Sequence, residues 1–257
     1  MTDVLDISTA IGALLLVALA VGLSLWQRVG VARSILWAAF RAAVQLLAVG
    51  AVFTVVIGSD LADWWAWVWV AVMVLVAGET ARRRAREVPG LRTLVMAAIA
   101  ASTGIALAIV FGSQVFDLEP VIVVVVAGIT IGNTLPGTVL AVDRSAAYLS
   151  DNRTQIEGLL ALGFDGKGAT RFMVRDTARL ALTPQIERTK VVGLIALPGA
   201  MTGLLLAGVD PVEAVVVQLV VMYLVLGAVS VAVIVVVTYI ARKALTPDLR
   251  LQNWIRQ

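Results

Sequence analysis

Cysteine and histidine are both missing from this sequence of 257 residues. The chain can therefore form no disulfide bond, and it lacks the ligands of the usual zinc and haem sites and the bases of Ser-His-Asp and Cys-His catalysis. It also lacks the Gly-x-x-x-x-Gly-Lys-Ser/Thr loop that holds nucleotide phosphates, so any ATP hydrolysis has to occur in another subunit. Charged residues make up only 14% of the chain, where roughly a quarter is usual in soluble domains. We therefore do not expect an enzyme.

Apolar residues dominate instead. They form 60% of the chain, and the mean hydropathy is +0.97. Apolar segments close to the ~20 residues that cross ~30 Å of hydrocarbon recur along the whole length. Since lipid offers no hydrogen-bond partner to the backbone, these segments are predicted to be helices. The prediction is an all-α, polytopic integral membrane bundle of about seven transmembrane helices, forming one transmembrane domain over residues 1–257. The seven segments are 7–26, 35–57, 64–80, 93–112, 120–135, 191–207 and 213–240.

The charges of the predicted loops alternate between acidic and basic along the chain. The N-terminal tail and the segments 58–63, 113–119 and 208–213 together hold eight carboxylates and no lysine or arginine, whereas 19 of the 20 basic residues lie in the other loops and the C-terminal tail. Basic loops stay in the cytoplasm. The N-terminus is therefore expected outside and the C-terminus inside, in the plasma or inner membrane. The first apolar run has acidic residues before it and basic residues after it, the reverse of a cleaved signal peptide, and is interpreted as a retained helix.

One long hydrophilic segment, residues 141–190, is predicted to be cytoplasmic and helical and to lie between the fifth and sixth transmembrane helices. Apolar residues recur in it at helical spacing. Residues 170–182 are predicted to form an amphipathic helix that carries Arg171 and Arg175 on one face and ends at Pro184. A glycine-containing turn joins it to a preceding helix. Such a pair of helices is suited to docking a partner.

Three stretches carry motifs of a known family. They are residues 128–140 (Gly-Ile-Thr-Ile-Gly-Asn-Thr-Leu-Pro-Gly-Thr-Val-Leu), the spacing Glu157-x5-Gly163, and residues 190–211, which are the most specific. They resemble the permease subunit of the Fet-type, iron-exporting ABC transporters, and the similarity extends over about residues 30 to 245. Membrane subunits of plant aluminium-tolerance transporters are similar. The resemblance implies a bacterial permease that pairs with a second copy of itself and with two separate ATPase subunits. Those subunits would bind the ATP and magnesium, and no cofactor is expected in this chain.

The resemblance also implies a coupling site. It places Glu157 and Gly163 where many ABC permeases present a helix to the ATPase, with Arg171 and Arg175 on the helix that follows. The glycine would let a partner helix approach closely, and the carboxylate would meet a basic residue of the partner. The alternative is an ordinary solvated helix that ends at a glycine.

Polar residues and a proline inside the predicted spans mark a candidate substrate pathway. Pro198 removes a backbone hydrogen bond, and freed carbonyls in a span are tolerated only where protein or a water-filled cavity satisfies them; a plain kink is the alternative. Asn133 and Gln218 line the pathway or else join helices. Arg41, the one basic residue inside a span, either extends to the membrane surface or faces inward toward Glu79 or an anionic substrate. The candidate pathway residues are Arg41, Gln45, Asn133, Pro198, Met201, Thr202 and Gln218.

The expected function is the membrane-spanning permease subunit of an ABC exporter for iron or another metal ion. No metal-ligating cluster is expected in the chain, because the carboxylates lie at the two membrane faces and soft ligands are missing. A metal is therefore expected to bind weakly, partly hydrated or chelated. No nucleic-acid partner is expected. Two alternatives stay open: the same machinery carrying a small organic or lipid-like molecule, and a stand-alone channel or secondary carrier, which inverted repeats would support.

Overall fold

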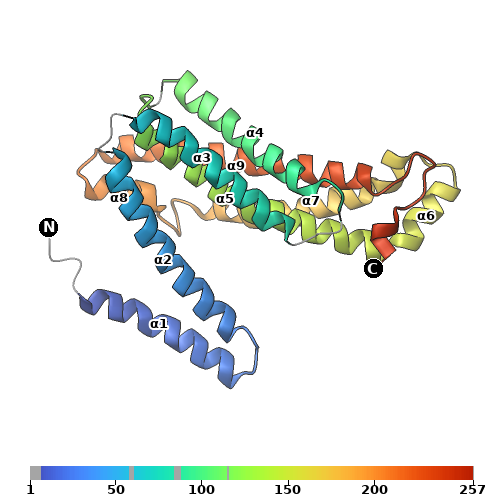
Figure 1. Ribbon diagram of the computed structural model, residues 1–257, viewed down its shortest axis with the longest axis horizontal. Coiled ribbons are helices and arrows are strands. Elements are labelled where there is room, and N and C mark those ends of the chain that lie inside the picture. Colours follow the sequence, from blue (N-terminus) through green and yellow to red (C-terminus); the bar gives the residue numbers. More distant parts are fainter. Residues whose placement is uncertain (1–6, 58–60, 84–87, 115, 257) are drawn as a thin grey trace. The chain divides into compact units, whose positions relative to one another are not determined.

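The computed structural model describes residues 7–57, 61–83, 88–114 and 116–256, and the regular structure in these residues is helical (Figure 1). The predicted all-α fold class is confirmed. The helices are α1 (Ile7–Trp26), α2 (Ala32–Ile57), α3 (Ala62–Arg82), α4 (Leu91–Gly112), α5 (Pro120–Asp151), α6 (Arg153–Ala161), α7 (Gly166–Val191), α8 (Gly199–Leu206), α9 (Pro211–Lys243) and the 3-10 helix η1 (Asn253–Arg256).

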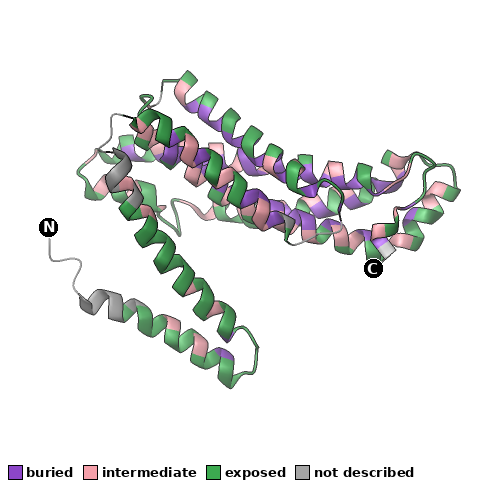
Figure 2. Ribbon diagram, in the orientation of Figure 1, coloured by how far each residue is buried: buried purple, intermediate pink, exposed green. Residues whose placement is uncertain are grey.

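The chain divides into two compact units, residues 1–62 and 63–257. In the first unit α1 packs against α2, and the turn between them contains Arg28 and Gly30 with φ angles of 53° and 80°. Most described side chains of these two helices are exposed, as Figure 2 shows. A helix that is apolar all round and exposed is suited to lipid, not to water.

α9 is the centre of the second unit and packs against α4, α5, α7 and α8. Its buried side chains recur every three or four residues, which places them on one face of the helix; they include Val225, Val229, Val233 and Ile240. Gly137 of α5 permits a close approach to this face, because a Cβ atom there would lie 3.0 Å from Cγ1 of Val229 and 3.3 Å from Cγ2 of Val233. Small residues commonly allow such contacts between membrane helices.

Five helices of the described residues are long and apolar enough to cross a membrane, which confirms a multi-pass arrangement. The described apolar part of α1, Leu14–Trp26, is shorter than a full crossing. The orientation, with the N-terminus outside, stays a prediction. The five spans are Ala32–Ala51, Ala62–Ala81, Leu91–Gly112, Pro120–Asp151 and Pro211–Lys243.

The expected sixth transmembrane helix, residues 191–207, is not a single helix, so the prediction of about seven transmembrane helices is wrong at this point. Residues 192–198 are irregular, with Gly193 at a φ of 89°, and α8 is only eight residues long. The irregular segment ends at Pro198, which precedes the first residue of α8. Proline is compatible with the start of a helix and not with its interior, so the break falls where the sequence placed it.

The expected end of a helix at Pro184 is also wrong. α7 continues through Pro184 to Val191 and packs along α5 and α9. Proline removes one backbone hydrogen bond from the helix, but packing along two neighbours stabilises the turns on either side. In Figure 1 the far end of α7 therefore lies beside the middle of the second unit and not at its end.

Candidate functional site

The turn between α6 and α7 is closed by a glycine-dependent cap, as the predicted helix pair required. The Phe164 N–H donates to the Leu159 carbonyl at 3.1 Å, and the Gly163 N–H donates to the Leu160 carbonyl at 3.0 Å. This is the Schellman arrangement, in which the residue after the helix takes a left-handed conformation; Gly163 has a φ of 89°. Asp165 then caps α7 by accepting a 2.7 Å hydrogen bond from the Gly168 N–H. Gly163 is thus needed for the turn itself.

The predicted coupling carboxylate has a partner within its own helix. Arg153 Nη2 lies 2.8 Å from Glu157 Oε1, one turn away on α6, and the side chain of Glu157 is 47% exposed. The carboxylate can therefore be reached from solvent and exchange its internal partner for an external one. Large apolar side chains flank Gly163: Leu162 is 79% exposed and Phe164 49% exposed. The role of Glu157 and Gly163 in coupling stays a prediction.

Packing of α7 against α9 forms a basic pocket of about 580 Å³. Arg171 and Arg175, both predicted as coupling residues, line it together with Lys167 and with Arg242 of α9. The surface of the pocket is mostly apolar, and the four cationic side chains among its lining residues favour a partner that carries carboxylate or phosphate groups. Sequence reasoning missed the contribution of Arg242, because it is far from Arg171 along the chain and reaches the pocket only through helix packing.

Asn133 is joined to a residue that the sequence analysis did not select. Its Oδ1 accepts a 2.9 Å hydrogen bond from Nη1 of Arg188 on α7, and its Nδ2 donates to the Ile129 carbonyl at 2.7 Å. Close to Arg188 in the chain, Lys190 and Glu187 form an ion pair, with 2.8 Å between Lys190 Nζ and Glu187 Oε1. Arg188 belongs to the hydrophilic segment 141–190, and no local feature of the sequence indicates its contact with Asn133, 55 residues away.

The remaining pathway residues of the second unit lie on α8 and α9. Gln218 of α9 is buried at 5% exposure, and its Oε1 has no hydrogen-bond partner among the described residues. Thr202 and Met201 are half-buried on α8, where the Thr202 hydroxyl donates to the Pro198 carbonyl at 3.0 Å. The hydrogen bonds between described residues join only Asn133 of this predicted set to another helix.

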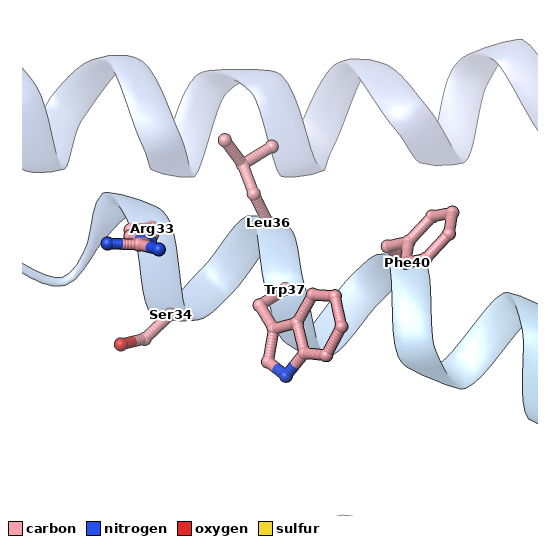
Figure 3. Close-up of a pocket in the computed structure, with 5 residues that line it drawn as sticks. All are labelled: Arg33, Ser34, Leu36, Trp37 and Phe40. Carbon is pink, nitrogen blue, oxygen red and sulfur yellow. The ribbon is translucent and has the colours of Figure 1, made fainter.

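Arg41 and Gln45 are exposed on α2, in the first unit, and their place on the pathway stays a prediction. Glu79, one of the alternatives for Arg41, lies 3.5 Å from Arg83 and 3.8 Å from Arg92. One turn before Arg41, α2 carries a surface pocket of about 590 Å³ (Figure 3). The rings of Trp37 and Phe40 lie 5.9 Å apart. Polar and aromatic side chains together are typical of a helix end at the membrane surface. The pocket is lined by Arg33, Ser34, Leu36, Trp37 and Phe40.

The long apolar helices define a multi-pass membrane protein. The chain matches the uncharacterised protein family UPF0014 over residues 7–245, and it belongs to that family. No solved structure matches it.

Relatives of this chain occur in plants and bacteria. UPF0014 membrane protein STAR2 of Oryza sativa subsp. japonica is 38% identical over 222 residues, 86% of this chain and 78% of the relative. The protein ALUMINUM SENSITIVE 3 of Arabidopsis thaliana is 33% identical over 220 residues, 86% and 80% of the two chains. The probable iron export permease protein FetB of Escherichia coli (strain K12) is 31% identical over 223 residues, 87% and 86% of the two chains. The family resemblance drawn from the sequence is confirmed.

Proposed function

We propose that this chain is the permease subunit of an ABC exporter that moves iron or another metal ion across the plasma membrane. It would act as a homodimer together with a separate ATP-binding subunit that hydrolyses ATP with magnesium. The similarity to a relative named as a probable iron export permease supports iron as the cargo, since the match covers most of both chains. The family membership supports the role of membrane subunit.

The exposed side chains at the turn between α6 and α7 are the main support for an ATPase partner. Its exposed side chains, Leu162 and Phe164, are too apolar to be left in the cytoplasm without a reason, because exposed apolar groups beside charged ones are typical of interaction sites. The basic pocket with Arg171 and Arg175 lies on the same helix, α7. An ATPase subunit with an apolar groove and carboxylates at its rim would match both features.

The test is reconstitution of the chain with candidate ATP-binding subunits from the same organism. We expect the two to copurify, the membrane subunit to stimulate ATP hydrolysis, and cells that contain both to lose iron faster than cells with either one. Reversing the pocket charge with the double variant Arg171→Glu/Arg175→Glu should abolish copurification. Arg144→Glu, an exposed arginine of α5 outside the pocket, is the control with the same type of charge change. Metal transport by the chain without any ATPase would instead support a channel or secondary carrier.

A further inference from the structure

The hydrogen bond between Arg188 and Asn133 places a guanidinium group beside the candidate membrane span of α5. Asn133 lies thirteen residues after Pro120, the first residue of α5. At ~1.5 Å per residue this is about 20 Å from one end of the helix, and the distance to Asp151 at the other end is about 27 Å. A hydrocarbon core of ~30 Å that begins near either end of α5 therefore encloses this level. Arg188 Nη1 lies 2.9 Å from the Asn133 Oδ1, so it shares that depth.

The packing of α5 on α9 gives the same depth independently. Gly137, one turn after Asn133, lies against Val229 and Val233 of α9. Val229 comes eighteen residues after Pro211, the first residue of that helix, which corresponds to about 27 Å. Both helices begin after acidic segments at the same predicted membrane face. The two distances therefore place the level of Asn133 within the ~30 Å of hydrocarbon that these helices would cross.

Arg188 is accompanied by two more charged groups that are exposed in the single chain. The Glu187–Lys190 pair is 2.8 Å long, and its side chains are 58% and 63% exposed. Charged groups at this depth are strongly disfavoured in contact with lipid and are found facing water-filled cavities or protein. The irregular segment 192–198 follows directly, and Leu194 in it is 93% exposed. Irregular backbone at membrane depth is tolerated only in the same two environments.

The net charge of this group of residues is positive. Glu187 neutralises Lys190, whereas Arg188 is held by a neutral amide and has no ion-pair partner among the described residues. The Asn133 amide is itself oriented by its bond to the Ile129 carbonyl, so its oxygen faces the guanidinium group. Asn133 is therefore a positioning residue for a fixed positive charge. A guanidinium group binds carboxylate and phosphate oxygens through two parallel hydrogen bonds and repels a bare cation.

We infer that the end of α7, residues 187–190, together with Asn133, is a substrate-binding station in a water-filled pathway, and that it takes an anionic cargo. On the proposed function, on which this inference rests, the metal would cross while bound to a ligand with carboxylate or phosphate oxygens, not as a bare cation. The station would bind the ligand, and the metal would need no side chain of the protein.

The form of the cargo is tested in proteoliposomes that contain the permease and its ATPase subunit. Uptake of radioactive iron is compared for ferric citrate, ferric pyrophosphate and ferrous ion without a chelator. We expect ATP-dependent uptake of at least one of the two anionic complexes. Uptake of ferric citrate would indicate a carboxylate ligand, and uptake of ferric pyrophosphate would indicate a phosphate ligand. Arg188→Gln should lower that uptake by about tenfold or more while ATP hydrolysis continues. Arg188→Lys should retain part of it, and Arg179→Gln, on the same helix and outside the station, should leave it unchanged.

The outcomes separate the two proposals. The wild-type complex could instead take up the bare ferrous ion with ATP, and Arg188→Gln could leave that uptake unchanged or raise it. This result would contradict the anionic cargo, but it would be consistent with the proposed exporter. If the wild-type complex hydrolyses ATP but moves none of the three forms, or does not assemble, the proposed function fails and the inference falls with it.

The water-filled pathway is tested by thiol labelling, which needs no transport. Since the chain has no cysteine, single cysteines introduced as Glu187→Cys and Lys190→Cys can be labelled without background. A charged, membrane-impermeant reagent should modify both from one side of the membrane. Val216→Cys, exposed on α9 near the opposite membrane face, is the lipid-facing control and should not react. Protection of both station positions from both sides would overturn the pathway.

Discussion

Replacing Asn133 with alanine distinguishes a pathway role from a role in joining helices. The change removes the acceptor of the 2.9 Å hydrogen bond from Arg188 and the donor of the 2.7 Å hydrogen bond to Ile129. Hydrogen bonds to charged groups are worth about 1.5–3 kcal/mol in soluble proteins, whereas interhelical contacts in membranes average about 0.6 kcal/mol. Because the Arg188 side chain is exposed, the lower part of this range applies. We therefore expect the free energy of unfolding to fall by about 1 kcal/mol.

A loss of this size corresponds to a fall in Tm of roughly 2–4 °C for a chain of this length. The assay is thermal unfolding in detergent, followed by size-exclusion chromatography, for the wild type, Asn133→Ala, Arg188→Ala and the double variant. The coupling energy from this cycle should be about 1 kcal/mol. Asn152→Ala is a matched control, because Asn152 makes the same type of hydrogen bond to the carbonyl four residues earlier, at 3.1 Å from Tyr148 O.

Transport measured on the same four proteins decides the role. We expect Asn133→Ala to lower iron transport by about tenfold, beyond the small loss of folded protein, while ATP hydrolysis by the partner continues. A coupling energy near zero would refute the contact between Asn133 and Arg188. Measurable coupling with unchanged transport would make Asn133 a contact between helices and would remove it from the pathway.

Three further predictions test the turn, the helix packing and the topology. Gly163→Asn should keep the complex with the ATPase, and Gly163→Val should weaken it, because a β-branched residue at positive φ costs about 1–2 kcal/mol. Copurification of the ATPase compares the two variants, and equal amounts of bound ATPase would contradict the prediction. Gly137→Leu should reduce the yield of folded protein through overpacking of about 1–3 kcal/mol, whereas Gly132→Ala, with open space around it, should not; chromatography of both variants compares them. An impermeant thiol reagent should label Asp117→Cys only from outside and Lys167→Cys only from inside, and the reverse pattern would invert the topology.

Local features of the sequence account for most of the helices. The spans within α3, α4, α5 and α9 follow from apolar runs, since lipid leaves the backbone no alternative to a helix. The turn between α6 and α7 follows from Gly163, because a left-handed residue after a helix favours glycine. Such features depend only on neighbouring residues, and they are predictable for that reason.

Contacts between distant segments were decided by the tertiary structure alone. The sequence predicts the end of the helix at Pro184 and gives no local sign of a contact between Arg188 and Asn133, which lie 55 residues apart. Packing along α5 and α9 instead extends α7 through the proline and brings Arg188 to Asn133. The same packing joins Arg242 to Arg171 and Arg175. Hydropathy and charge along the chain determined which segments are helical and multi-pass, whereas the polar partners of those helices depend on which faces meet in three dimensions.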